Sequence, residues 1–192
     1  MSRMEPVTVD RPGKYARVER ERRFLLASAP PVPPGRGRRI TDRYLTHTQM
    51  RLRRAEQLDG GPPELKLTQK IPAERPGPVQ GLITNIYLSP LEYDVFAALP
   101  ARTLSKYRYS RPPLGIDVFR PPLDGLVIAE AEFDSDDDMH AFPVPEFAVA
   151  EVTADARFTG GRLADATRDD VLGWLAEYGV TPAGPLAGNA RQ

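Results

Sequence analysis

Several segments of the chain alternate between apolar and polar residues with a period of two, which is the pattern of antiparallel strands. Proline interrupts the pattern often: there are 21 prolines in 192 residues, and proline is confined to turns, sheet edges and the first turn of helices. Most segments between prolines are therefore too short for a helical bundle. Eight of them predict strands, at residues 17–25, 40–46, 48–54, 64–71, 82–88, 103–110, 115–119 and 126–133.

Three further segments carry helix-capping residues. The sequence Ser-Pro-Leu-Glu at 89–92 combines an N-cap, a first-turn proline and a capping-box glutamate. Residues 135–142 begin with serine and three aspartates, which favour the positive end of a helix dipole. Residues 167–179 predict a last helix with an apolar stripe and a terminal glycine. The predicted fold class is mainly β (α+β), with about eight antiparallel strands, a few surface helices and a C-terminal helix.

Charged residues occupy one face of five predicted strands, where alternation would otherwise place a core. An open sheet whose charged face meets water is one explanation. The other is a closed barrel, because about eight antiparallel strands can surround a space wide enough for a small ligand. In a barrel, the matching faces would line the lumen with seven cations (Arg23, Arg51, Arg53, Lys66, Lys70, Lys106 and Arg108) and four carboxylates (Glu19, Glu21, Glu130 and Glu132).

A lumen of this composition would bind a polyanion. Lysine and arginine bind phosphate oxygens, and arginine does so with two N–H groups at once. Carboxylates repel phosphate, so we expect them to hold Mg²⁺ or Mn²⁺, which bridges carboxylate and phosphate oxygens. Glu19 with Glu21, and Glu130 with Glu132, have the spacing that directs both side chains of a strand into one cavity. Cysteine is absent, which excludes thiol nucleophiles and Cys/His zinc sites.

Composition and charge narrow the class of protein. With 41% hydrophobic and 27% charged residues, the chain is too apolar for a disordered protein and too polar for a membrane protein. Lys plus Arg and Asp plus Glu both number 26, so the basic excess of nucleic-acid-binding proteins is missing. We therefore predict a cytoplasmic protein without nucleic-acid or membrane partners, with one domain at 15–179 and disordered tails at 1–14 and 180–192. A homodimer is an open alternative to a monomer.

Seven short segments form an ordered set along the chain. They are VERERRFL (18–25), MRLRR (50–54), ELKLTQK (64–70), SKYRY (105–109), IDVF (116–119), AEAEF (129–133) and EVTADARF (151–158). Taken in this order, they resemble the CYTH family, whose members are also called triphosphate tunnel metalloenzymes. The resemblance covers residues 15–161 and implies an eight-stranded antiparallel barrel whose tunnel binds triphosphates with a divalent metal and usually hydrolyses them.

The resemblance also implies roles for individual residues. Glu19 and Glu21 match the first two members of the family's E-x-E-x-K signature, and the L-T-Q-K ending favours Lys70 over Lys66 as its later lysine. The implied metal ligands are Glu19, Glu21, Asp117, Glu130, Glu132 and Glu151. The implied substrate-binding residues are Arg51, Arg53, Lys66, Lys70, Lys106 and Arg108, and the implied catalytic residues are Glu19, Glu21, Arg23, Tyr44 and Lys70.

Two positions depart from the family pattern. Arg23 stands where the signature has lysine, and a guanidinium cannot readily give up a proton. The predicted strand at 82–88 lacks the charged pattern that is common there, which leaves the substrate range open. We expect a divalent-metal-dependent triphosphatase acting on inorganic tripolyphosphate or on a nucleoside or other organic triphosphate. An adenylate cyclase and a non-catalytic module that binds polyphosphate or a triphosphate are the alternatives.

Other residues with distinctive chemistry predict no site. His47 and His140 have no partner at metal-ligand spacing, so we expect both to be exposed to solvent. Residues 134–138 are acidic but lack the spacing of a calcium loop, and residues 35–39 are basic and predict a solvated loop. Trp174 is expected to pack the last helix against the barrel.

Overall fold

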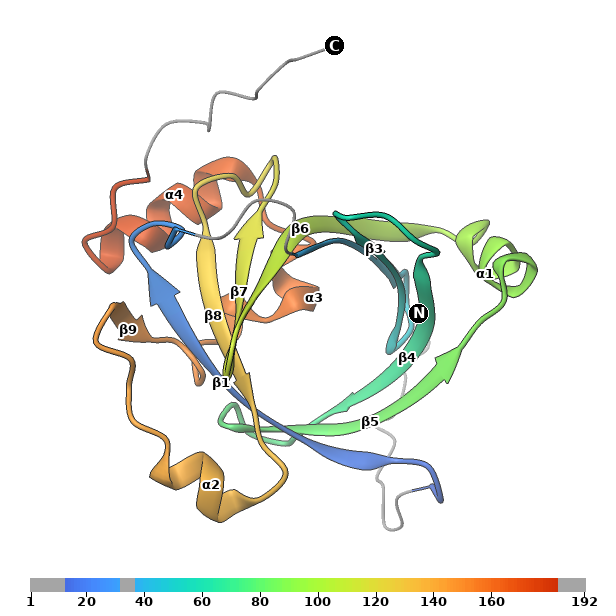
Figure 1. The fold of residues 1–192 in the computed structure, drawn as a ribbon, viewed down its shortest axis with the longest axis horizontal. Helices are drawn as coiled ribbons and strands as arrows, with labels where there is room; N and C mark the ends of the chain where they lie inside the picture. Colours follow the sequence, from blue (N-terminus) through green and yellow to red (C-terminus); the bar gives the residue numbers. More distant parts are fainter. Residues whose placement is uncertain (1–12, 32–36, 183–192) are drawn as a thin grey trace, which may run out of the picture.

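Nine antiparallel strands form the framework of the protein, and eight of them close into a barrel (Figure 1). The computed structural model describes residues 13–31 and 37–182. Around the barrel the order is β5-β4-β3-β2-β6-β7-β8-β1, and β1 pairs back with β5. This closure confirms the predicted barrel and excludes the open sheet. The strands are β1 (Arg17–Leu26), β2 (Arg38–Leu45), β3 (Met50–Gln57), β4 (Glu64–Pro72), β5 (Val79–Tyr87), β6 (Ala101–Arg111), β7 (Leu114–Phe119), β8 (Val127–Glu132) and β9 (Ala148–Glu151).

The long first strand closes the barrel. Its first half pairs with β5, its second half pairs with β8, and its last residues also pair with β9, which lies outside the ring. The pairing with β5 shifts register between Glu19 and Arg20, opposite Gly81. Gly81 has a φ of +131°, and a Cβ there would lie 2.0 Å from the carbonyl oxygen of Ile71. This junction of three strands therefore requires glycine.

The predicted helices begin at their predicted caps. They are α1 (Pro90–Ala97), α2 (Asp136–Ala141) and α4 (Arg168–Glu177), and the N-cap side chains of Ser89, Ser135 and Thr167 each accept a hydrogen bond from the backbone three residues later. Three short elements were not predicted: β9, the 3₁₀ turn η1 (Ala156–Phe158) and α3 (Gly160–Leu163). Strand β9 and helix α3 have four residues each, and α3 begins with two glycines, so neither gives a clear periodic pattern.

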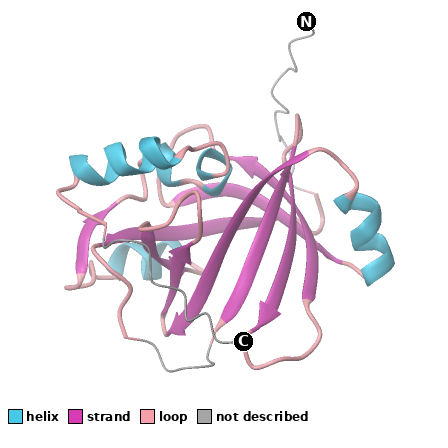
Figure 2. Ribbon diagram, turned by 90° about the horizontal axis from the view of Figure 1, so that it is seen from above, coloured by secondary structure: helices cyan, strands magenta, loops and turns pink. Residues whose placement is uncertain are grey.

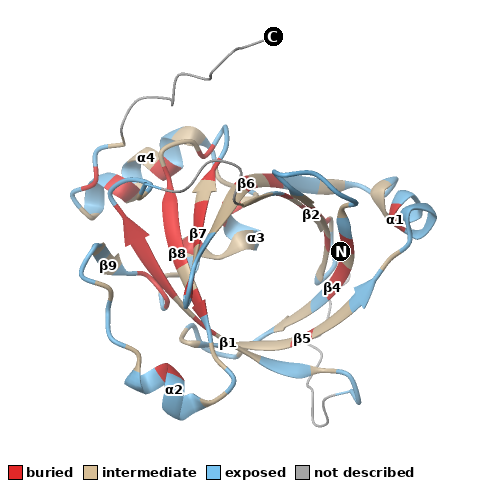
Figure 3. Cartoon of the chain, viewed as in Figure 1, coloured by how far each residue is buried: buried red, intermediate tan, exposed pale blue. Residues whose placement is uncertain are grey.

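Apolar side chains pack on the outside of the barrel wall and across one end of it. Helix α1 covers an outer cluster on β2, β3 and β4, and the segment around α2 covers a second one on β1, β7 and β8. A third apolar cluster, which we call the end cluster, joins inward residues such as Leu25 and Phe119 to η1, α3 and α4. Figures 1 and 2 show α1 and α4 on opposite sides of the barrel, and Figure 3 shows the buried residues concentrated along β1, β7 and β8. The charged faces are therefore free to line the lumen.

Trp174 packs against Phe158 edge to face, with ring centroids 6.2 Å apart, and both histidines are exposed, as predicted. Val180, which was assigned to the C-terminal tail, is buried in the end cluster. Residues 1–12, 32–36 and 183–192 lie outside the described residues and include most of the predicted tails and part of the basic loop at 35–39. No helix within the described ranges is long and apolar enough to cross a membrane.

Candidate functional site

The inner faces of the strands enclose a cavity of about 420 Å³, which we call the lumen cavity. It contains all seven cations and all four carboxylates that alternation assigned to the lumen. Two further charged residues, Arg17 and Asp42, also line it, although the predicted lumen set did not include them. The complete charged lining has eight cations (Arg17, Arg23, Arg51, Arg53, Lys66, Lys70, Lys106 and Arg108) and five carboxylates (Glu19, Glu21, Asp42, Glu130 and Glu132).

Asp42 organises the cations of β3. It is 1% exposed, and Nε and Nη2 of Arg53 donate to its two carboxylate oxygens at 2.6 and 2.7 Å. Nε of Arg51 lies 3.7 Å from the same carboxylate. Burial acts to raise the pKa of Asp42, but Arg53 and Arg51 outweigh it and hold the pKa well below its usual range. The sequence could have identified Asp42, because it lies two residues before Tyr44 and a strand places both side chains on the same face.

The basic wall formed by β3 and β4 retains hydrogen-bonding capacity. A guanidinium nitrogen of Arg51 donates to Thr68 at 3.2 Å, but its Nε is buried and has no hydrogen-bond partner among the described residues. Lys66 lies nearby, and burial together with the positive charges of Arg53 and Arg51 lowers its pKa. Three cations at close quarters repel one another, and an anion between them would relieve that repulsion. The wall is therefore suited to bind phosphate oxygens.

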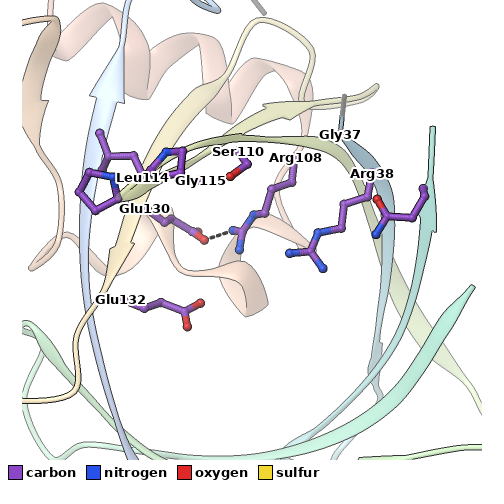
Figure 4. A pocket seen from close by; sticks show the side chains of 11 residues that line it. Gly37, Arg38, Arg108, Ser110, Leu114, Gly115, Glu130 and Glu132 are labelled. Carbon is purple, nitrogen blue, oxygen red and sulfur yellow. Dashed lines mark hydrogen bonds and ion pairs between the residues drawn. The ribbon is translucent and has the colours of Figure 1, made fainter. Parts of the chain in front are cut away.

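The acidic wall lies on β1 and β8. Lys70 Nζ donates to both carboxylate oxygens of Glu19, at 2.8 and 2.9 Å, and Glu21 lies 3.6 Å from Arg23. Burial and the neighbouring charge of Glu130 raise the pKa of Glu21 to about 7. The carboxylate of Glu132 projects into the barrel (Figure 4) and has no ion-pair partner in the part of the chain that is described. This wall therefore carries more negative charge than its neighbours neutralise.

A buried network on β6, β7 and β8 adjoins the acidic wall. Asp117 is 0% exposed and accepts hydrogen bonds from Lys106 and from Arg108, whose Nε lies 2.6 Å from a carboxylate oxygen. Arg108 also pairs with Glu130. Burial acts to raise the pKa of Glu130, but Arg108 and Lys106 hold it well below its usual range. Asp117 therefore anchors two lumen cations and does not reach the cavity surface.

Arg23 and Tyr44 connect the lumen to the end of the barrel. Arg23 is 4% exposed, and its guanidinium donates to the carbonyl oxygens of Thr153 at 3.0 Å and Phe158 at 3.2 Å. Tyr44 lies against Gly160 at the start of α3, where a Cβ would be 2.0 Å from the tyrosine oxygen. Burial, helped by the charge of Asp42, raises the pKa of Tyr44, so its hydroxyl stays neutral. Arg23 thus holds the segment that leads into α3, while Tyr44 lies beside the first turn of that helix.

The donor chemistry of the acidic wall fits a hard divalent cation, because Glu19, Glu21, Glu130 and Glu132 offer oxygen ligands alone. Residues 13–31 and 37–182 contain no group of three His, Cys, Asp or Glu side chains close enough together to hold a metal ion. Glu19 and Glu130 instead face Lys70 and Arg108.

Two residues of the predicted metal set are not brought to the lumen. Asp117 lies beneath Lys106 and Arg108. Glu151 pairs across the strands with Phe24, on the outer face of β1, and its carboxylate accepts from Arg22 at 2.6 and 2.9 Å. Cross-strand partners share a face, so Glu151 points away from the tunnel. We correct the predicted metal set by leaving both residues out.

The fold is shared with a solved protein. No protein-family model matches the sequence, and no curated protein matches it. Two crystal structures of NE1496, an inorganic triphosphatase, each superimpose with a TM-score of 0.51. One has 29% sequence identity and covers 78% of this chain and 99% of NE1496; the other has 27% identity and covers 77% and 95%.

A more distant likeness, to PH1819 from Pyrococcus horikoshii OT3, has 14% identity and a TM-score of 0.46 over 85% of this chain and 92% of that one. The closed barrel of eight antiparallel strands, the charged lumen and the likeness to NE1496 all indicate the same fold. The chain has the fold of the CYTH, or triphosphate tunnel, family, in agreement with the resemblance of its motifs.

Proposed function

We propose that this protein is a divalent-metal-dependent triphosphatase, which hydrolyses a phosphoanhydride bond of inorganic tripolyphosphate or of an organic triphosphate. The observation that carries the proposal is the lumen cavity, in which eight cations face a wall of carboxylates. The likeness to NE1496, an inorganic triphosphatase, supports it. The partner is then a small-molecule triphosphate, and a cytoplasmic location remains our prediction.

The chain's own residues would bind and orient the substrate. Arg51, Arg53 and Lys66 would bind phosphate oxygens from β3 and β4, and Lys106 and Arg108 would do so from β6. Because Asp42 and Asp117 already fix the cations beside them, little reorganisation is needed when charge develops on a transferring phosphoryl group. The protein would therefore act chiefly by positioning and by electrostatic stabilisation.

The acidic wall would hold the metal. Glu19, Glu21, Glu130 and Glu132 would be the residues that bind Mg²⁺ or Mn²⁺, and the ion would neutralise phosphate charge. Lys70 lies beside Glu19, and its ammonium is partly exposed to the lumen. It is the best placed titratable cation for the catalytic role that the motif implies.

One observation favours a second candidate, a binding module without turnover. Arg23 replaces the signature lysine, and its guanidinium is engaged with the carbonyl groups of Thr153 and Phe158. A guanidinium remains protonated and cannot act as a general acid. Phosphate release distinguishes the two candidates. A triphosphatase releases phosphate, whereas a binding module binds triphosphates without releasing it.

Phosphate release from a panel of triphosphates tests the proposal. We expect release with Mg²⁺ or Mn²⁺ and loss of release in excess EDTA. Glu132→Gln should lower turnover far more than stability, since it removes ligand charge and nearly preserves shape. Glu146→Gln, at an exposed carboxylate outside the lumen lining, is the control. Undiminished turnover in EDTA would refute metal dependence, and release of pyrophosphate with cyclic AMP from ATP would instead identify a cyclase.

A further inference from the structure

Strand β5 contains no charged residue, yet one of its polar side chains, Asn85, lines the lumen cavity beside the basic wall. Asn85 lies opposite Thr68 on β4, and Thr68 lies opposite Arg51 on β3, so the three side chains form a row on the lumen face. Thr68 is 0% exposed and does not line the cavity, whereas Asn85 is half-buried and does. A ligand in the lumen can therefore reach Asn85 as well as Arg51.

Hydrogen bonds along this row fix the orientation of the Asn85 amide. Nη2 of Arg51 donates to Oγ1 of Thr68 at 3.2 Å, and a guanidinium has donors only, so Thr68 is the acceptor. The single hydroxyl hydrogen of Thr68 is then donated to Oδ1 of Asn85 at 2.7 Å. If the amide were turned over, this buried hydrogen would have no acceptor among the described residues. The amide oxygen of Asn85 is therefore occupied, and its NH₂ group is left to bind a ligand in the lumen.

An amide NH₂ group suits an anion and not a metal ion, because it donates hydrogen bonds and offers no oxygen ligand. Its surroundings are cationic. Lys66 and Lys70 lie two residues to either side of Thr68 on the same strand face, and Nε of Arg51 is buried without a hydrogen-bond partner in the described part of the chain. A carboxylate at position 85 would neutralise these cations, whereas the amide adds a donor and leaves their charge to the ligand.

We propose that Asn85 is a substrate-binding residue, whose amide NH₂ group donates a hydrogen bond to an anionic phosphate oxygen beside Arg51. Thr68 is the positioning residue that holds the amide in this orientation. The inference rests on the proposed triphosphatase function and adds a neutral, directional donor to the binding site. Hydrogen bonds to charged acceptors are the stronger ones, so the contribution of Asn85 to affinity is measurable.

Two substitutions and their combination test the inference. Asn85→Ala removes the donor, and Thr68→Val removes the hydroxyl that links Asn85 to Arg51 while nearly preserving shape. The double variant leaves no buried hydroxyl without a partner, so it should fold even if Asn85→Ala alone does not. Thr84→Ala, on the same strand but outside the lumen lining, is the matched control. Circular dichroism checks the folding of all four variants.

The probes are tripolyphosphate and ATP. Calorimetry measures their binding with Mg²⁺ and again in excess EDTA, and phosphate release measures turnover. We expect Asn85→Ala to raise Kd for both probes about tenfold or more, Thr68→Val to raise it by a smaller factor, and Thr84→Ala to leave it unchanged. The double variant should bind more weakly than Thr68→Val, because the donor itself is lost.

A double variant that binds as tightly as Thr68→Val would show that Asn85 acts only through Thr68, and this would overturn the inference. An unchanged Kd in Asn85→Ala would overturn it as well, whether or not the wild type releases phosphate. If the wild type binds the probes without releasing phosphate, and Asn85→Ala still weakens binding, the triphosphatase function alone is refuted. A wild-type protein that binds neither probe would refute both.

Discussion

Asp42 orients the two arginines of β3 that face the lumen. Its carboxylate is bidentate to Arg53 and lies near Arg51, and it is almost completely buried. A guanidinium fixed in this way loses little further freedom when it binds a phosphate. Asp117 has the same relation to Lys106 and Arg108. Each group of cations is therefore oriented by a buried carboxylate that need not touch the substrate.

Replacing Asp42 by asparagine should weaken both stability and binding. Asparagine preserves the shape but leaves Arg53 buried without its counter-charge, so we expect a loss of about 2–4 kcal/mol in the free energy of unfolding at pH 7. Tripolyphosphate affinity should fall as well, because Arg51 and Arg53 become less ordered. Urea unfolding and calorimetry measure the two effects.

The same substitution has a defined pH dependence. Arg53 and Arg51 hold the pKa of Asp42 in the folded protein below its unfolded value, which is about 4. The stability that Asp42 contributes is therefore fully present above pH 4 and is lost as the pH falls toward the folded pKa. The difference in unfolding free energy between the wild type and Asp42→Asn should narrow below about pH 4. A constant difference down to pH 2 would contradict the assignment.

Arg23 is held by backbone carbonyl groups, which changes the expectation for Arg23→Lys. A lysine is a single point donor and cannot serve Thr153 and Phe158 in the geometry of a guanidinium. We expect a loss of about 1–3 kcal/mol in unfolding free energy and a change of less than about tenfold in kcat. Urea unfolding and steady-state kinetics with saturating metal measure these. A large gain in kcat would show instead that the missing lysine is a general acid.

Among the elements, α3 depends on a close approach that only glycine permits. Gly160 begins the helix against Tyr44, whose oxygen would lie 2.0 Å from an added Cβ. We expect Gly160→Ala to destabilise the protein by about 1–3 kcal/mol, because either α3 or the tyrosine must move. The lumen lining on both sides should be disturbed as well, so turnover should fall. Thermal unfolding and phosphate release measure the two changes.

Two further variants test whether the contact between Gly160 and Tyr44 causes this loss of stability. Gly161 has open space, with the nearest Tyr44 atoms 4.0 Å from a Cβ, so Gly161→Ala should have little effect. Tyr44→Phe removes the oxygen and should restore part of the stability lost in Gly160→Ala. If Gly160→Ala is as harmless as Gly161→Ala, then α3 does not pack against Tyr44 as described.

The whole molecule combines a net charge of zero with a lumen rich in cations. A ligand that binds the folded state alone stabilises it by about 2.7 kcal/mol at a concentration of one hundred times Kd. Tripolyphosphate with Mg²⁺ should therefore raise Tm, and added salt should reduce the shift because ions screen the attraction.

Two variants test whether tripolyphosphate raises Tm by binding in the lumen. Lys66→Ala should reduce the shift in Tm, whereas Arg39→Ala, at an exposed cation that does not line the lumen cavity, should not. Differential scanning fluorimetry measures both. An equal reduction in the two variants would mean that tripolyphosphate binds the outer surface.

Local patterns in the sequence were sufficient for much of this fold. Alternation with a period of two identified eight strands and, in five of them, the face that carries charge, because side-chain direction in a strand depends on local geometry alone. Capping residues identified α1, α2 and α4 for the same reason. Strand β9, η1 and α3 were missed because they are too short to show a period, and tertiary contacts hold them in place.

Only the tertiary structure decided how far each charged side chain extends into the tunnel and which oppositely charged side chain it contacts. Asp117 and Glu151 both occupy positions that the motifs implied, yet one is buried under Lys106 and Arg108 and the other faces Arg22 outside the barrel. Asp42 became recognisable as a partner of Arg53 only through the pairing of β2 with β3. Strand register and barrel closure bring together residues that are distant along the chain. A local sequence pattern contains no information about the register or the closure.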